Sequence, residues 1–237
     1  MNSKWTQVKT YGSIFLTLGL VALLSAPAFA KDTLPATSHD GLQLQKDTKL
    51  AAVYLKPGET LDGYDKVSIT DVYVAFKKNW QRNYNRDHMG LDGRVSDKDV
   101  EVIKNRLAKE FTAVFAKELQ DRGGYEVVDS AAKDVLVLRP AIINLVVNAP
   151  DVNQAGRGRT FVASAGEMTL YLELYDSLTG DILARVMDAQ AAGNYGIAHM
   201  GGRVANKAEF DRVLVKWAEI LRTHLDNVKG AAASTGT

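Results

Sequence analysis

Residues 134–151 read DVLVLRPAIINLVVNAPD, and this stretch decides whether the chain contains a membrane span or a buried strand. Sixteen residues lie between the two terminal aspartates, and Arg139, Pro140, Asn144 and Asn148 interrupt an otherwise apolar run. A transmembrane helix needs about 20 predominantly apolar residues and rarely holds a charge near its centre, so a bilayer is disfavoured. A central strand with both faces covered is apolar on both faces, and we predict that this segment is one.

Two residues of this predicted strand have special requirements. Pro140 lacks an amide hydrogen, so it is expected at a bulge or where that side of the strand has no partner. Arg139 needs a carboxylate or carbonyl partner if it is buried, and we predict a structural buried charge paired with Glu173 or Asp188. An anion site around Arg139 is the alternative.

Alternating patterns on either side of this segment predict further strands. KVSITDVYVAF (66–76) changes phase by one residue at Thr70 and Asp71, which is typical of a bulged strand. YEVVD (125–129) is a short strand. GEMTLYLELYD and DILARVMDAQAAG are separated by SLTG (177–180), the usual composition of a hairpin turn.

Two apolar stripes at spacings of three and four residues predict two long helices. The first helix opens at Ser96, with Asp97 and Asp99 at its positive end, and stops at two consecutive glycines. The second opens at Asn206, with Glu209 in the capping-box position. The resulting order, β-α-β-β-β-β-α, predicts an α+β two-layer sandwich. It would hold a mixed, mostly antiparallel sheet of about five strands with both helices on one face.

The N-terminal residues have the features of a secretory signal peptide. Lys4 and Lys9 precede a short apolar segment and the small-residue end SAPAFA, which predicts cleavage near Ala30. An uncleaved anchor is the alternative, but the apolar segment is about half the ~20 residues that a span needs. We therefore expect a periplasmic or secreted protein without a membrane span after cleavage. The predicted divisions are a signal peptide (1–30), a flexible leader (31–50), one α+β domain (51–229) and a disordered tail (230–237).

Composition excludes several classes of function. The chain has 29 basic and 28 acidic side chains, and loss of Lys4 and Lys9 with the signal peptide leaves a formal charge of −1. That balance gives no electrostatic footprint for nucleic acid. The sequence contains no cysteine, so disulfides, thiolate ligands, thiol nucleophiles and lipid attachment at cysteine are excluded.

Several of these segments together resemble a known family. YEVVD…KDVLVLRPAIINLVVNAPD, AGEMTLYLELYDSLTGDILARVMDAQ and FDRVLVKWAEILRTHLD are similar to bacterial envelope proteins catalogued as domain of unknown function three-three-one-three. The resemblance covers roughly residues 50–228, and the Asp-Ser-Leu-Thr-Gly turn is its most specific part. Many members of that family are lipoproteins, whereas this chain lacks the lipid-bearing cysteine. The resemblance supports the fold and the compartment and implies no activity.

Two glycine-containing loops and one polar segment supply candidate binding residues. AGRGRTF (155–161) carries Arg157 and Arg159, and NYGIAHMGGR (194–203) carries Arg203. These arginines are expected at one end of the sheet, where they could hold an anion. Trp80 and Tyr84 lie in a polar stretch that is predicted to be a loop, where large rings pack or bind a partner. Solvated loops without a ligand are the alternative.

Motifs for catalysis and metal binding are weak. LDGRVSDKD (91–99) resembles half of a calcium loop, but His88 and Gly90 would stand at its first two ligand positions. Helix capping is the preferred explanation of its acidic residues. The four histidines are isolated from one another, and no H-E-x-x-H or G-x-S-x-G motif is present. No cofactor, metal or catalytic residue is predicted, although residues distant in sequence could still assemble a catalytic site.

The sequence therefore supports two hypotheses of different classes. The preferred one is a non-catalytic periplasmic module that interacts with another envelope protein or a cell-wall component through its loop edge. The alternative is a small-ligand or anion-binding protein, or an unrecognised hydrolase, that uses the arginines of the two loops.

Overall fold

The computed structural model describes residues 34–87, 94–147, 165–191 and 203–235. Three helices and one eight-stranded sheet lie in these ranges. The strands are β1 (Gln43–Leu44), β2 (Ala52–Leu55), β3 (Lys66–Ile69), β4 (Tyr73–Phe76), β5 (Glu126–Val127), β6 (Val135–Val147), β7 (Ala165–Asp176) and β8 (Ile182–Ala191). The helices are α1 (Trp80–Asp87), α2 (Asp97–Gly123) and α3 (Arg203–Thr235).

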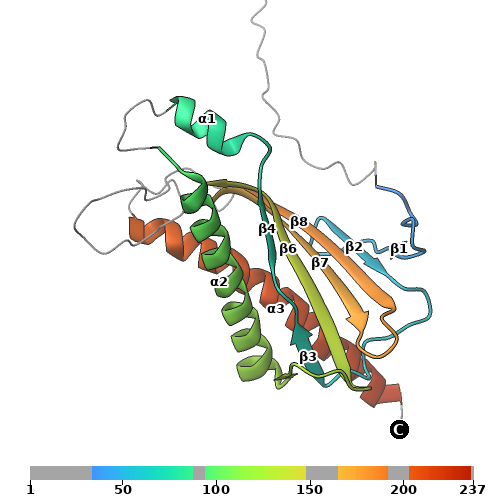
Figure 1. Cartoon of the computed structure of the whole chain (residues 1–237). Coiled ribbons are helices and arrows are strands. Elements are labelled where there is room, and N and C mark those ends of the chain that lie inside the picture. The colour runs from blue at the N-terminus through green and yellow to red at the C-terminus, as the bar shows by residue number, and fades with distance from the viewer. Residues whose placement is uncertain (1–33, 88–93, 148–164, 192–202, 236–237) are drawn as a thin grey trace, which may run out of the picture. The chain divides into compact units, whose positions relative to one another are not determined.

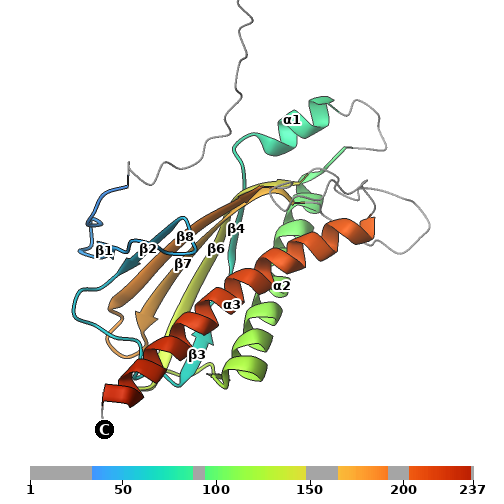
Figure 2. The same cartoon turned by 180° about the vertical axis from the view of Figure 1, so that it is seen from behind.

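The two long helices, α2 and α3, lie side by side on one face of the sheet, as Figures 1 and 2 show from opposite sides. The main core lies between these helices and the sheet, where Phe111, Phe115, Leu138, Ile142 and Trp217 are almost fully buried. The α+β class and the two helices on one face are confirmed. The sheet has eight strands rather than about five, because the additional strands are only two to four residues long and carry little alternation. No helix among the described residues is long and apolar enough to cross a membrane.

Strand β6 is an interior strand, as the sequence predicts. It pairs antiparallel with β7 on one side and parallel with β3 and β4 on the other. The sheet order is β1-β2-β8-β7-β6-β3-β5, with β4 also beside β6. β7 and β8 form the predicted hairpin, and Gly180 in its turn has a φ of 71°.

The predicted bulged strand is divided into β3 and β4. Ile69 pairs with Leu138 and Tyr73 pairs with Ala141, so three residues of this edge face two residues of β6. The break coincides with Pro140. The Leu138 carbonyl accepts the Thr70 amide on this side, and alternate residues of a strand direct their backbone groups to the same neighbour. Pro140, which has no amide hydrogen to donate, therefore faces the break between β3 and β4.

The ends of α2 follow from its sequence. Ser96 caps the first turn, its hydroxyl accepts the Asp99 amide at 3.3 Å, and the Asp99 carboxylate accepts the Ser96 amide at 2.9 Å. Gly124 ends the helix with a left-handed φ of 69°. The last helix, α3, begins at Arg203 rather than Asn206 and continues to Thr235. The tail predicted from Gly230 therefore starts within the helix.

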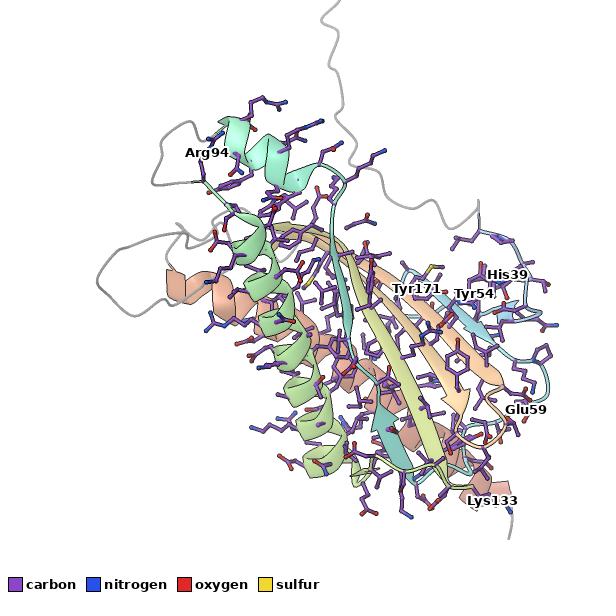
Figure 3. All side chains as sticks on the ribbon, in the orientation of Figure 1. His39, Tyr54, Glu59, Arg94, Lys133 and Tyr171 are labelled. Atoms are coloured by element: carbon purple, nitrogen blue, oxygen red, sulfur yellow. The ribbon has the colours of Figure 1, made fainter. Side chains whose placement is uncertain are left out.

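Residues 34–50 are packed against the sheet and are not the flexible leader that their polarity predicts. Leu42 is 1% exposed and packs with Ala52 and Tyr54 on the open face, which is the sheet face turned away from α2 and α3. Figure 3 shows Tyr54 and His39 on this side of the sheet. The apolar side chains of this segment are few, but Leu34, Leu42 and Leu44 belong to one cluster with residues of β2 and β8.

Candidate functional site

A cavity of about 370 Å³ lies between the sheet and α3. Its walls come from β2, β7, β8 and α3, and the loop of residues 45–50 borders it. We refer to it as the sheet–α3 cavity. Its lining residues are Gln45, Lys46, Asp47, Thr48, Lys49, Leu50, Val53, Leu55, Leu61, Leu170, Leu172, Leu174, Ala184, Val186, Trp217, Ile220, Leu221, Thr223, His224 and Asn227.

The walls of the sheet–α3 cavity are apolar because they consist of the alternate residues of β7 and the residues one turn apart on α3 that face each other. Leu170, Leu172 and Leu174 alternate along β7 and point to the helix face. Trp217 and Leu221 are one turn apart on α3 and lie on its sheet-facing side. Small or short side chains on β8, such as Ala184, leave space between these layers.

The mouth of the cavity is polar. Lys46, Asp47 and Lys49 of the 45–50 loop are exposed, and Thr223 and His224 of α3 are exposed on the other side. Two lysines and one aspartate line the cavity, which gives a formal charge of +1 with the histidine neutral. The arrangement therefore combines an apolar interior with a hydrogen-bonding, weakly cationic entrance.

The 45–50 loop is fixed at its two ends. The Gln45 amide donates to the Val53 carbonyl at 2.8 Å, and the Ala51 amide donates to Asp188 Oδ1 at 3.1 Å. Asp188 is 6% exposed, and its Oδ2 also accepts the indole N–H of Trp217 at 2.7 Å. A single buried carboxylate thus connects the end of the loop to the wall of the cavity.

A second polar group lies on the open face and joins the N-terminal segment to the sheet. Arg185 donates to Glu173 Oε1 from Nε at 3.1 Å and from NH2 at 3.0 Å. It also donates to the two carboxylate oxygens of Asp40, at 3.0 and 2.5 Å. Tyr171 and Tyr175 donate their hydroxyls to Glu173 at 2.9 and 2.7 Å. The Arg185 side chain is 9% exposed, so this cluster holds a largely buried charge with several partners.

Ionisation of this cluster is fixed at neutral pH. Hydrogen bonding from Arg185 holds the pKa of Asp40 well below its ordinary value. Burial raises the pKa of Glu173, but hydrogen bonds from Tyr175, Tyr171 and Arg185 outweigh it, and the pKa is lowered overall. Burial, followed by the hydrogen bond to Glu173, raises the pKa of Tyr171 to about 12. The cluster therefore holds stable charges and binds the segment around Asp40 in place.

Arg139 is not the buried charge that the sequence predicts. Its side chain is 68% exposed, and its NH1 lies 3.8 Å from Glu173 Oε2. The predicted partner Glu173 is correct, whereas Asp188 instead accepts from Trp217 and Ala51. Arg139 points to the open face at a position that the N-terminal segment does not cover, so its guanidinium reaches solvent.

Trp80 and Tyr84 lie on α1, in a stretch predicted to be a loop. Trp80 is 7% exposed, stacks on Phe76 with ring centroids 4.3 Å apart, and donates its indole N–H to the Val147 carbonyl at 3.2 Å. Tyr84 is partly buried, with its ring centroid 5.6 Å from that of Trp80. Trp80 is therefore a core residue that anchors α1 by packing, which is one of the two roles expected for it, and binding of a partner by Trp80 and Tyr84 stays a prediction.

The predicted arginine rim falls almost entirely outside the described residues. Arg157 and Arg159 lie outside them, and Arg203 is the first residue of α3, with a side chain that is not described. Their convergence on one surface stays a prediction. His88 and Gly90 of the possible calcium loop also lie outside the described residues, while Asp99 caps α2. Within the described ranges, no group of three His, Asp or Glu side chains could hold a metal ion.

A family model described as "Protein of unknown function (DUF3313)" matches residues 31–221. The chain belongs to this family. The resemblance predicted from the sequence is thereby confirmed, and the DUF3313 match begins at the first residue after the predicted cleavage site. No curated protein sequence matches the chain.

Solved structures similar to this DUF3313 chain have low sequence identity to it. The PelC dodecamer from Paraburkholderia phytofirmans is 14% identical, with a TM-score of 0.33 over 69% of this chain and 96% of that chain. A neuraminyllactose-binding hemagglutinin homolog from Helicobacter pylori is 11% identical, with a TM-score of 0.37 over 74% and 92%. Protein XCC0632 from Xanthomonas campestris, of the DUF330 family, is 14% identical, with a TM-score of 0.35 over 76% and 94%.

The sequence gives only a weak signal for the sheet–α3 cavity. Its interior residues are those of an ordinary core, and only their arrangement leaves a space between layers. The 45–50 loop lies in the segment predicted to be a leader. One usable signal is AAVYL (51–55), which is apolar on both alternating faces and therefore indicates a strand covered on both sides.

Proposed function

We propose that this protein is a non-catalytic binding protein of the cell envelope that holds a small apolar ligand in the sheet–α3 cavity. The observation that carries the proposal is a cavity of about 370 Å³ with leucine and tryptophan walls and a polar mouth. Ligand pockets are typically of about 300–1,000 Å³, mostly apolar, with a few polar groups at defined positions. The signal-peptide pattern of residues 1–30 supports export.

The two tryptophans of the exported chain allow a direct test. Trp217 lines the cavity, whereas Trp80, the first residue of α1, stacks on Phe76 and does not line it. The full-length sequence is expressed, and the protein is purified from the periplasmic fraction. A neutral apolar probe such as N-phenyl-1-naphthylamine is then titrated against it. We expect saturable binding with one site per chain and quenching or shift of Trp217 emission, retained in Trp80→Phe and lost in Trp217→Phe.

A cavity-filling variant makes the test specific to this site. Ala184 is 1% exposed and faces the cavity, so Ala184→Leu is expected to abolish probe binding. Ala141→Leu is the matched control, because Ala141 is partly buried on β6 and points to the open face. Equal binding by both variants, or failure of the unmodified protein to bind any apolar probe, would remove the cavity as the functional site.

The interaction-module hypothesis has one supporting observation of its own. The β4, β6 and β7 part of the open face carries Tyr73, which is 65% exposed, next to half-buried Ala141 and Tyr171. Exposed aromatic side chains beside aliphatic ones are typical of protein contact surfaces. Tyr73→Ser, compared with the unmodified chain in crosslinking of periplasmic extracts, tests this surface. Identical crosslinked products would exclude it.

A further inference from the structure

We propose that the ligand of the sheet–α3 cavity is an anionic single-chain amphiphile, with its alkyl chain against the leucine wall and its acidic head group between Lys46 and Lys49. This inference rests on the proposed function and adds the chemical class of the ligand. It follows from how polarity and charge are divided between the interior and the mouth of the cavity.

The buried side chains that line the cavity are apolar, and the half-buried polar ones, Gln45 and Thr48, already donate to the Gln43 and Leu50 carbonyls at 3.0 and 2.9 Å. β7 contributes three leucines, β8 contributes Ala184 and Val186, and α3 contributes Ile220 and Leu221. The indole N–H of Trp217, which is buried in the α3 wall, is already used in its 2.7 Å hydrogen bond to Asp188. An alkyl chain loses no hydrogen bond with water on entering such a space, whereas a sugar or nucleotide would leave polar groups unpaired.

The cationic groups stand only at the mouth. Lys46 and Lys49 are both exposed and line the cavity, and within the described part of the chain neither forms an ion pair. By contrast, Lys66 of β3 and Lys77, which follows β4, each have a carboxylate partner at 2.8 Å. Two uncompensated ammonium groups beside an apolar opening match a carboxylate or phosphate at the end of an alkyl chain.

A shallow depression beside the mouth extends the same surface. It is lined by Lys49, Lys216, Glu219, Ile220 and Thr223. The acid of this group, Glu219, accepts a hydrogen bond from Arg122 at 3.2 Å, so its charge is compensated from α2. The head group of a bound amphiphile therefore has the Thr223 hydroxyl on the α3 side in addition to the lysines of the 45–50 loop.

Asp47 is the one acidic residue that lines the cavity, and replacing it tests whether the site prefers an anionic ligand. It stands between the two lysines in a left-handed conformation with a φ of 55°. Its charge opposes an anionic head group, so Asp47→Asn is expected to tighten binding of an anionic ligand. The same change should leave binding of a neutral ligand unaffected.

The test compares head groups on one chain length by isothermal titration. Dodecanoate supplies a carboxylate, lauroyl lysophosphatidate supplies a phosphate, and dodecanol supplies no charge. We expect both anions to bind at least about 10-fold more tightly than dodecanol, with the difference reduced in 0.5 M salt. The preferred anion then distinguishes a fatty acid from a phosphate-headed lipid as the source of the ligand.

Charge reversal assigns the effect to the mouth. Lys46→Glu with Lys49→Glu should weaken dodecanoate binding at least about 10-fold and leave dodecanol unchanged. Lys98→Glu with Lys109→Glu is the matched control, because it changes the net charge equally on exposed positions of α2, which does not line the cavity. Equal loss in both double variants would overturn the local role of the two lysines.

The outcomes separate this inference from the function on which it rests. If dodecanol and dodecanoate bind equally and Ala184→Leu abolishes both, the cavity binds apolar ligands but the anionic head group is wrong. If none of the three amphiphiles binds, the proposed function fails together with the inference. If anions bind more tightly but Ala184→Leu has no effect, they bind elsewhere and the inference is overturned.

Discussion

Glu173 lies between two arginines in the sheet register, and replacing each arginine separately tests what burial does to an ion pair. Arg139 of β6 and Arg185 of β8 both stand opposite Glu173. The Arg185 side chain is 9% exposed and makes four hydrogen bonds. The Arg139 side chain is 68% exposed, and its NH1 lies 3.8 Å from Glu173 Oε2. The change to methionine keeps an unbranched side chain and removes only the guanidinium.

Arg185→Met should cost about 3 kcal/mol of unfolding free energy. Removing one partner of a buried ion pair costs about 3–5 kcal/mol, because the remaining charge stays buried without compensation. The lower end of this energy range applies to Arg185→Met, since Glu173 keeps hydrogen bonds from Tyr171 and Tyr175, and the Asp40 side chain is 23% exposed. For a domain of this size the loss corresponds to a decrease in Tm of about 6–12 °C. Arg139→Met should change the free energy by less than about 0.5 kcal/mol.

Urea unfolding followed by circular dichroism measures both variants at several pH values. The pKa values of Asp40 and Glu173 are lowered in the folded protein, so their stabilisation is complete above their ordinary values and is lost as the pH falls. The difference between the unmodified protein and Arg185→Met should therefore shrink below about pH 4. Equal destabilisation by both arginine variants, or a pH-independent difference, would refute this account of the buried pair.

Three further changes test individual contacts by the same unfolding measurement. Ser96→Ala removes the cap of α2 and should cost about 1 kcal/mol, while Ser96→Asp should restore most of it. Trp80→Phe keeps the stacking on Phe76 but loses the hydrogen bond to the Val147 carbonyl, with an expected cost of about 1 kcal/mol. Asp188→Ala removes the acceptor of the buried Trp217 indole N–H and of the part-buried Ala51 amide, should cost about 2 kcal/mol, and should accelerate hydrogen exchange at the Ala51 amide. An unchanged midpoint in any of these variants contradicts the corresponding contact.

The elements that sequence predicts well are those whose signals are local. The cap at Ser96, the glycine stop after α2 and the turn at residues 177–180 depend on neighbouring residues, and all three are present. The phase change at Thr70 and Asp71 likewise marks the one-residue offset between β3 and β4. The helix α1 was not predicted, because its eight residues are polar except for two rings and have no capping signal.

The features that sequence predicts poorly depend on partners far along the chain. Arg139 and Arg185 occupy equivalent positions opposite Glu173, and alternation cannot tell which of them is covered. The answer depends on where Asp40 lies, and residues 34–44 extend over β8 rather than β6. The cavity is equally non-local, because a gap between layers depends on how α3 crosses the sheet and not on the pattern of any one strand.

The position of β2 has a consequence for biogenesis. Ala52 pairs with Met187, 135 residues later in the chain, and β1 joins the sheet through β2. Closing so long a segment is entropically costly and slow, so the first strands of the chain to be synthesised are the last to pair with the sheet. The 45–50 loop between them is completed at the same late step. A chain that is interrupted before β8 would therefore expose the apolar face of an incomplete sheet, the kind of surface that chaperones and proteases recognise.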